Sequence, residues 1–152
     1  MQVVLYQPEI PPNTGNIIRL CANTGAALHL IEPLGFALDD KRLRRAGLDY
    51  HEYAQLQVHA DLSAYLQQAK PARLFACTTK GQSRYSDISY QKDDALLFGP
   101  ESRGLPPEVL QGIPPEHWLR LPMLPHSRSL NLANAVSVFV YEAWRQWDFN
   151  CL

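Results

Sequence analysis

Short apolar segments and longer amphipathic ones alternate along this chain of 152 residues. The short ones, such as "VVLY" at 3–6 and "DALLFG" at 94–99, have the length and composition of buried strands. The longer ones, such as 14–25 and 130–147, read as helices. Strands that alternate with helices indicate an α/β fold, with a mostly parallel sheet covered by helices on both faces. The expected strands are 3–6, 27–33, 52–59, 73–79, 94–99 and 117–123, and the expected helices are 14–25, 39–46, 61–69, 106–113 and 130–147.

The composition is that of a globular protein. Of all residues 46% are hydrophobic and 19% are charged, which argues against a disordered chain. The length favours one domain over 1–152, with no appended RNA-binding domain. No segment approaches the ~18 apolar residues of a membrane span, and the first residues lack the pattern of a secretory signal. We therefore expect a cytoplasmic protein that does not contact membranes.

Neither metal nor nucleotide motifs are found in the sequence. The three cysteines form no CxxC pair, and no two of the five histidines have the i, i+4 spacing of a helical metal site. We expect no metal. The chain also lacks GxGxxG after its first strand and GxxxxGK[ST] anywhere. The usual dinucleotide-binding and nucleoside-triphosphate-binding functions of an α/β chain are therefore disfavoured.

Three polar loops each follow an expected strand, at 78–87, 99–107 and 122–129. The second of them, "GPESRGLPP", places a carboxylate, a guanidinium and two glycines at the end of an apolar run. In parallel sheets, ligands bind beyond the carboxyl ends of the strands. We therefore expect these loops to form the walls of one pocket.

Three segments, taken in chain order, carry a family resemblance: "PEIPPNTGNIIRLCANTG" at 8–25, "LLFGPESRGLP" at 96–106 and "LRLPMLPHSRSLNLANAVSVFVYE" at 119–142. In this order and spacing they resemble the SpoU branch of the SPOUT superfamily of RNA methyltransferases, over essentially the whole chain. The segment "GFALDDKRLRRAGLDYHEY" at 35–53 is similar to the TrmL group of tRNA ribose 2'-O-methyltransferases. The resemblance implies methyl transfer from S-adenosylmethionine to the 2'-hydroxyl of the wobble cytidine or uridine in the tRNA anticodon loop.

The resemblance also implies a C-terminal deep trefoil knot and a homodimer whose site lies near the subunit interface. The last helix agrees with a dimer, because Val138, Phe139 and Tyr141 are apolar but lie outside its main apolar stripe. From the residues alone, that second side is covered either by another subunit or inside one monomer. Two other functions stay open: a 2'-O-methyltransferase that acts on rRNA, and a non-catalytic RNA-binding module on the same fold.

The resemblance assigns cofactor contacts to residues at the ends of strands and in the loops after them: Cys77, Gly99, Leu121, Ser129 and Leu130. Apolar walls and backbone polar groups suit the adenine ring of S-adenosylmethionine, and a glycine permits close approach of the backbone. Without the resemblance, Cys77 and Leu121 are ordinary core residues, and Gly99 is a turn at the end of a strand.

Catalysis is assigned by resemblance to Arg19, with Glu101 and Asn131 beside it. Arg19 is either a general base or a charged group that fixes a phosphate and stabilises the developing alkoxide. The first role is demanding, because the pKa of arginine lies above ~12. Glu101 is expected to orient Arg19 or Asn131, and is otherwise a satisfied turn carboxylate. Asn131 and Ser129 either shape the pocket or cap the last helix.

RNA is expected to be gripped by basic residues. Four of them crowd into "DDKRLRRAG" at 39–47, where an arginine-rich cluster suits bidentate contact with phosphate. The other interpretation of this cluster is a solvated helix face. His126 is also expected near RNA phosphate. The full set of RNA-binding candidates is Lys41, Arg42, Arg44, Arg45, Arg84 and Arg128.

Overall fold

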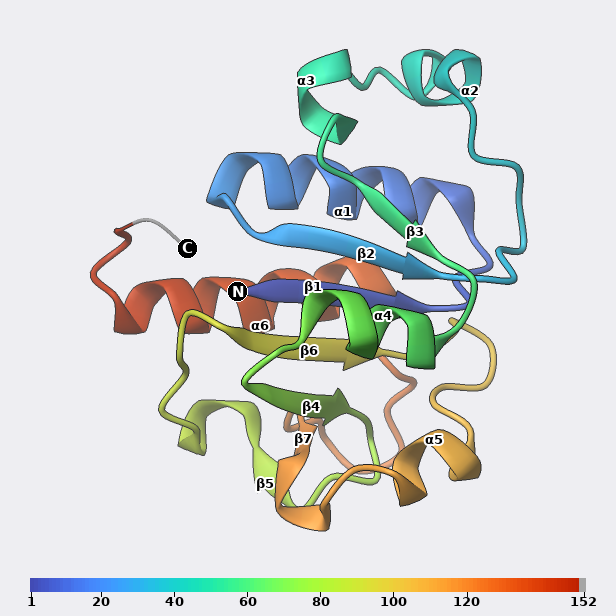
Figure 1. The fold of residues 1–152 in the computed structure, drawn as a ribbon. Coiled ribbons are helices and arrows are strands. Elements are labelled where there is room, and N and C mark those ends of the chain that lie inside the picture. The colour runs from blue at the N-terminus through green and yellow to red at the C-terminus, as the bar shows by residue number, and fades with distance from the viewer. Residues whose placement is uncertain (151–152) are drawn as a thin grey trace.

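The computed structural model describes residues 1–150, and its strands form one sheet in the order β3-β2-β1-β6-β4-β7-β5. Each pair of neighbouring strands runs parallel, and Figure 1 shows the common direction of β1, β2, β3, β4 and β6. The predicted α/β class and parallel sheet are therefore confirmed. The strands are β1 (Gln2–Tyr6), β2 (Ala27–Ile31), β3 (Gln57–His59), β4 (Arg73–Cys77), β5 (Ser83–Arg84), β6 (Asp94–Phe98) and β7 (Trp118–Arg120).

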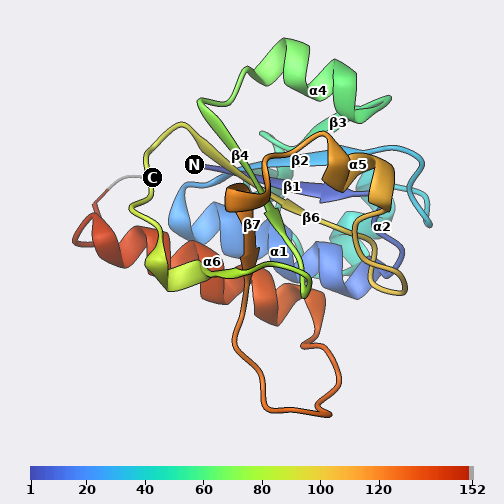
Figure 2. The same cartoon turned by 90° about the horizontal axis from the view of Figure 1, so that it is seen from below.

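Helices connect these strands: α1 (Pro11–Thr24), α2 (Asp40–Arg45), α3 (Tyr50–Tyr53), α4 (Leu62–Ala69), α5 (Pro107–Gln111) and α6 (Leu132–Gln146), with the 3-10 turns η1 (Tyr85–Asp87) and η2 (Pro115–His117). Figure 2 shows α1 and α6 on one face of the sheet and α4 on the other. The buried residues of α5 pack on the same face as α4. In residues 1–150, no helix has both the length and the hydropathy to cross a membrane.

The side chains of β1 show how the sheet is buried on two sides. Val3 and Leu5 pack into the core beneath α1 and α6, whereas Val4 packs into the core beneath α4 and α5. Successive side chains of a strand point to opposite faces, so a strand covered on both sides carries apolar residues at consecutive positions. β6 lies beside β1 in the middle of the sheet, and all five of its residues are buried.

The segment 52–59 is a correction to the expected strands. Only Gln57–His59 forms a strand, and the preceding residues form the short helix α3. Tyr53 ends that helix and is buried in the core beside α1, so its packing there decides the local conformation. Glu52 accepts a hydrogen bond from the backbone N–H of Asp49, three residues earlier. This D-x-x-E spacing is a helix-start signal that was available in the sequence.

Other boundaries moved for similar local reasons. The first helix begins at Pro11 rather than at residue 14, because proline is tolerated in a first helical turn. It ends before Gly25, whose φ of 82° lies in the left-handed region that glycine favours. The two-residue strand β5 had not been expected at all, since two residues carry no periodic signal.

β7 lies between β4 and β5 in the sheet, although β4 and β5 follow one another in the chain. Since all three strands run parallel, the connection 78–82 must return across β7 to start β5. That connection touches β7: the N–H of Thr78 donates to the carbonyl of Leu119 over 2.8 Å. A Cβ on Gly81 would lie 2.7 Å from the backbone of Trp118 and Leu119, so this crossing requires glycine.

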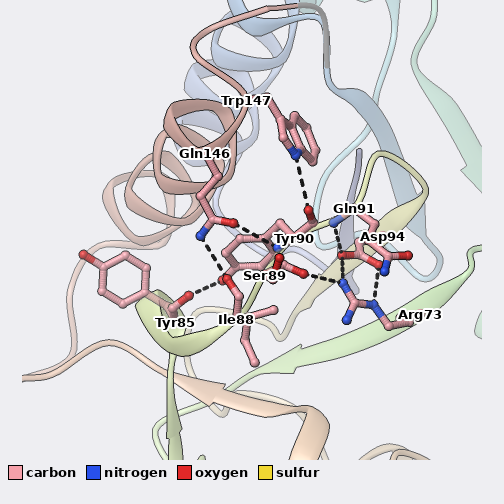
Figure 3. A network of polar contacts seen from close by, with 9 residues as sticks. All are labelled: Arg73, Tyr85, Ile88, Ser89, Tyr90, Gln91, Asp94, Gln146 and Trp147. Carbon is pink, nitrogen blue, oxygen red and sulfur yellow. Dashed lines mark hydrogen bonds and ion pairs between the residues drawn. The ribbon is translucent and has the colours of Figure 1, made fainter.

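A polar network lies at the amino ends of β4 and β6 (Figure 3). Asp94 is fully buried and accepts hydrogen bonds from Arg73 Nε and Nη2, at 2.8 and 2.6 Å. It also accepts from the N–H of Gln91 at 2.7 Å, and Arg73 donates to the carbonyl of Ser89. The buried carboxylate is therefore compensated by donors on several sides, as a buried charge requires.

The same network fixes the C-terminal end of α6. Gln146 accepts a hydrogen bond from the N–H of Tyr90 at 3.0 Å and donates to the carbonyl of Ile88 at 2.9 Å. Trp147 Nε1 donates to the carbonyl of Tyr90 at 3.2 Å. The Tyr90 hydroxyl also donates to the carbonyl of Tyr85. We call the connected set the basal network: Arg73, Tyr85, Ile88, Ser89, Tyr90, Gln91, Asp94, Gln146 and Trp147.

Two histidines are buried between the sheet and α4. His29 Nδ1 and His59 Nε2 are 3.0 Å apart, and each side chain packs on the ring of Tyr65. Burial, with a smaller contribution from the neighbouring His59, lowers the pKa of His29 to about 4. Burial also lowers the pKa of His59. The pair is therefore neutral at pH 7.

Candidate active site

One cavity of about 530 Å³ opens at the carboxyl ends of β4, β6 and β7. Its walls come from the loops that follow these three strands, together with the start of α1 and the first turns of α6. The three loops predicted to share a pocket do so. A cavity of this size accommodates a nucleoside-sized ligand.

All five residues proposed for the cofactor line this cavity: Cys77, Gly99, Leu121, Ser129 and Leu130. Cys77 ends β4, and burial raises the pKa of its thiol, so it stays neutral. Ser129 and Leu130 are exposed, and they lie on the long loop before α6 that Figure 2 shows. The lining also contains the apolar side chains Leu119 and Phe139, so an apolar wall is present.

Glycine is required at position 99 because the loop that follows it packs against its backbone. A Cβ at this position would overlap the backbone of Gly104 and Leu105, which folds back against it. Gly104 has a φ of 68°, and its N–H donates to the carbonyl of Pro100 at 2.9 Å. Leu105 then enters the core beneath α5. The close approach expected at Gly99 is therefore made by the chain itself.

Glu101 joins the second family segment to the first. Its carboxylate accepts hydrogen bonds from the N–H of Glu9 at 2.8 Å, from the N–H of Ile10 at 3.1 Å and from Asn13 Nδ2 at 3.2 Å. Among residues 1–150 it has no hydrogen bond with Arg19 or Asn131, which corrects the expected partners. Asn13 instead connects it to Asn131, whose Nδ2 donates to Asn13 Oδ1 at 2.8 Å.

Asn131 also begins the last helix. Its side-chain oxygen accepts from the N–H of Ala133 at 2.9 Å and lies 3.4 Å from the N–H of Asn134. The same residue lines the cavity, so the two roles that the sequence left open coexist. Asn13, which is buried, was not singled out as a site residue. The signal available for it was its place in "PNTGN" at the head of the first segment.

A second carboxylate makes the reciprocal contact. Glu9 accepts hydrogen bonds from the N–H and hydroxyl of Ser102, at 3.0 and 2.9 Å, and these lower the pKa of Glu9. Glu9 thus binds the loop that carries Glu101, while Glu101 binds the backbone of Glu9. We call this set the cavity network: Glu9, Ile10, Asn13, Glu101, Ser102 and Asn131.

Arg19 lies apart from the cavity, although it was the first candidate for catalysis. It is not among the described residues that line the cavity, and its side chain is about half exposed. Nε donates to Glu52 Oε1 at 2.9 Å, and Nη2 donates to the carbonyl of Gly47. The hydrogen bond and charge of Glu52 raise the pKa of Arg19. Arg19 therefore lies outside the cavity of its own chain, and its catalytic role stays a prediction.

The basic residues of the expected RNA surface are also separate from the cavity. Lys41, Arg44 and Arg45 border an open depression on α2, and Arg42 pairs with Asp39 at 3.4 Å. Elsewhere, Arg84 on β5 pairs with Asp87 at 3.6 Å, while Arg128 and His126 are exposed on the loop before α6.

Two further cations line the cavity and had not been proposed: Lys80 and Arg103. Arg103 is held by Gln7, whose side-chain oxygen accepts from Nη2 at 2.6 Å. Both cations lie within the loops predicted to form the pocket, so their position in the sequence already indicated that they could line it. Among residues 1–150 there is no group of three or more histidine, cysteine or acidic side chains that could hold a metal ion.

Comparison with known proteins agrees with this geometry. The chain is 65% identical over 149 residues to the tRNA (cytidine(34)-2'-O)-methyltransferase of Aeromonas hydrophila, covering 98% of this chain and 96% of the relative. A solved structure concerned with the 2-OH methylation of C/U34 on tRNA is 47% identical, with a TM-score of 0.86 over 98% of this chain and 97% of that one.

A more distant structure has the same fold with a ligand present. The AdoMet-bound rRNA methyltransferase of Sinorhizobium meliloti is 27% identical, with a TM-score of 0.79 over 95% of this chain and 55% of that one. The family model described as the SpoU rRNA Methylase family matches residues 1–141. With its three diagnostic segments meeting around one cavity, the chain belongs to the SpoU methylase family of the SPOUT methyltransferases.

Proposed function

We propose that this protein transfers a methyl group from S-adenosylmethionine to the ribose 2'-hydroxyl of nucleotide 34, cytidine or uridine, in the tRNA anticodon loop. The observation that carries the proposal is the convergence of 8–25, 96–106 and 119–142 on one cavity through the cavity network. The relative that is 65% identical has this activity in its name, which favours tRNA over rRNA as substrate.

The residues around the cavity suit the cofactor. Leu119, Leu121 and Phe139 supply apolar walls for an adenine ring, and strand ends supply backbone donors and acceptors. Lys80 and Arg103 supply positive charge for a carboxylate or a phosphate. When bound, S-adenosylmethionine brings an electrophilic methyl group. The protein's own part is to orient the two reactants and to exclude water.

We further propose that the protein acts as a homodimer. Val138 and Tyr141 on α6 are 39% and 47% exposed, so one side of this largely apolar helix has no cover among residues 1–150. α1 packs beside α6 and carries Arg19 on its exposed surface. If a second copy bound this surface, Arg19 of one subunit would lie at the cavity of the other subunit. This would explain why Arg19 lies apart from the cavity of its own chain.

Of the two roles open to Arg19, we propose the charged one. The Glu52 carboxylate raises the pKa of Arg19, so loss of a proton to act as a general base is made harder. A permanently charged guanidinium can bind the phosphate beside the target ribose and stabilise the developing alkoxide. Glu101 and Asn131 then act by fixing the walls of the cavity.

RNA contact is proposed for two surfaces. One is α2 with Lys41, Arg42, Arg44 and Arg45, and the other contains Arg84, Arg128 and His126 around β5 and the loop before α6. Contacts with phosphate release counterions, so affinity for tRNA should fall steeply with salt. We also propose a cytoplasmic location, where tRNA would be the substrate.

The C-terminal knot is part of the same proposal. β7 lies between two strands that are consecutive in the chain, and the connection 78–82 crosses it at Gly81. From β7 the chain continues into the long loop and α6, on the α1 side of the sheet. This path supports a chain whose last segment is threaded through an earlier loop.

The test is methyl transfer to defined RNA. Purified protein, labelled S-adenosylmethionine and tRNA transcripts with cytidine, uridine or 2'-O-methylcytidine at position 34 are combined, and the product is mapped by mass spectrometry. Label at position 34, absent from the blocked transcript, is the expected result. Label in rRNA fragments alone would transfer the proposal to rRNA, and binding without label would favour a non-catalytic module.

A further inference from the structure

Arg19 is held in a cradle formed by one short segment of chain, residues 47–52. The carboxylate of Glu52 uses Oε1 to accept from Arg19 Nε at 2.9 Å and Oε2 to accept from the N–H of Asp49 at 2.5 Å. The carbonyl of Gly47 accepts from Arg19 Nη2. Glu52 therefore connects the guanidinium to the backbone of its own turn.

The cradle is fixed by packing on both sides. Leu48 and Tyr53, which flank its central residues, are only 4% and 7% exposed and belong to the core beside α1. Gly47 has a φ of 77°, a conformation that glycine favours, and this directs its carbonyl to Arg19. The two acceptors are thus set by buried neighbours rather than by the arginine that they hold.

Stability alone gives little reason for this arrangement. The side chains of Arg19 and Glu52 are 51% and 20% exposed, and ion pairs in water contribute little to folding because solvent screens them. A free arginine side chain samples many rotamers, and their loss is a cost of any precise contact. The contact's main consequence is one fixed direction for the guanidinium.

We propose that Glu52 is a positioning residue for methyl transfer, acting through Arg19. This rests on the proposed function, in which Arg19 meets the substrate. Arginine has five N–H donors, and the cradle uses two of them, so three stay available for the 2'-oxygen and its neighbouring phosphate. Glu52 leaves the reactive side of the guanidinium free while preventing its rotation.

The cradle also begins where the basic helix ends. α2 stops at Arg45, and the N–H of Gly47 donates back to the carbonyl of Arg44 at 3.0 Å. The segment 40–52 therefore carries both a proposed phosphate-binding surface and the two acceptors that hold Arg19. Contact of tRNA with α2 and the orientation of Arg19 depend on the same stretch of backbone.

The experiment compares Glu52→Ala, Glu52→Gln and, as control, Glu116→Ala, which removes an exposed carboxylate from η2. Single-turnover rates at position 34 are measured with cofactor affinity, tRNA affinity and melting temperature. We expect Glu52→Ala to lower the rate on the order of 10- to 100-fold with both affinities and the melting temperature kept. Glu52→Gln, which retains an acceptor, should recover most of the rate. An unchanged rate in Glu52→Ala overturns the inference, as does a rate lost only in proportion to stability.

A double variant separates this inference from the proposed function. Arg19→Gln should be slow, and adding Glu52→Ala to it should change the rate less than about twofold, because the two residues act as one unit. If Glu52→Ala slows Arg19→Gln as much as it slows the wild type, Glu52 acts independently and the inference fails. If Arg19→Gln keeps the wild-type rate, the proposed role of Arg19 fails, and the inference about Glu52 fails with it.

Discussion

Two polar networks tie the last helix to the sheet, one at each end, and they differ in what they leave open. In the basal network, the carboxylate of Asp94 is fully buried and surrounded by protein donors (Figure 3). In the cavity network, Glu101 is half-buried and Asn131 is exposed, and both line a cavity of about 530 Å³. The basal network is filled by its own protein groups, whereas the cavity network holds loops in place around an open cavity.

The comparison shows that similar groups have different roles at the amino and carboxyl ends of the strands of one parallel sheet. Both networks combine a carboxylate, a side-chain amide and backbone N–H groups, and both connect α6 to segments far away in the chain. Substitutions at the base should act on stability, and those at the cavity should act on methyl transfer. The following predictions test that division.

The largest effect is expected for Asp94→Ala. Loss of a buried carboxylate that pairs with Arg73 leaves its donors without partners and should lower the free energy of unfolding by about 3 kcal/mol. Urea denaturation measures this, and Asp93→Ala, at an exposed neighbour, serves as control. Folded Asp94→Ala protein should keep its rate of methyl transfer. A stability like that of the control would contradict the role given to the basal network.

Glu101→Ala should show the opposite pattern. Its carboxylate holds the backbone at Glu9 and Ile10, so the loop 99–105 should lose its fixed position and the rate should fall on the order of 100-fold. The loss of stability should stay near 1 kcal/mol. Glu108→Ala, at an exposed position on α5, is the matched control. If Glu101→Ala kept full activity but lost much of its stability, the cavity network would serve stability and the proposed division would be wrong.

The buried histidine pair, which belongs to neither network, makes a prediction about pH. The pKa of His29 is about 4 in the folded chain, below its ordinary value near 6.5, so the unfolded chain binds more protons between these values. The free energy of unfolding should therefore be intact above pH 6.5 and fall by about 1–3 kcal/mol as the pH drops toward 4. Urea midpoints across this range measure it. His29→Asn should flatten the dependence, and an equal slope in that variant would exclude His29 as its source.

The smallest effect is expected at the other end of the basal network. Gln146→Ala removes one acceptor from the N–H of Tyr90 and one donor to the carbonyl of Ile88. Both hydrogen bonds join uncharged groups, whose net contribution to folding is smaller than that of a buried ion pair, so the cost should be about 1 kcal/mol. Gln67→Ala, on the exposed side of α4, gives the background value in the same assay. A difference of zero would limit the network to Arg73 and Asp94.

The sheet and the cavity could be predicted because each depends on strong local patterns. β1 and β6 are short, and residues 3–5 and 95–98 within them are apolar without a break, as in a strand covered on both faces. The loops after β4, β6 and β7 meet since parallel strands end at one edge. The resemblance to a family then selected five residues as cofactor contacts, and all five line the cavity.

What could not be predicted depends on contacts between distant segments. Nothing near Arg19 in the sequence shows that Gly47 and Glu52 will hold it, because that contact follows from the packing of α3 on α1. The role of Asn13 between Glu101 and Asn131 likewise joins positions about a hundred residues apart. The spacing of residues along a helix predicts which face of the helix a side chain lies on. It does not predict which distant residue that side chain contacts in the folded chain.

The placement of β7 has a consequence for synthesis on the ribosome. Two of the three loops around the cavity belong to strands that flank β7 or to β7 itself, and the helix capped by Asn131 comes later still. A growing chain can pair β1, β2 and β6 before α6 is made, yet the wall of the cavity that α6 supplies is then still missing. A chain without α6 should therefore be unable to hold the proposed methyl donor.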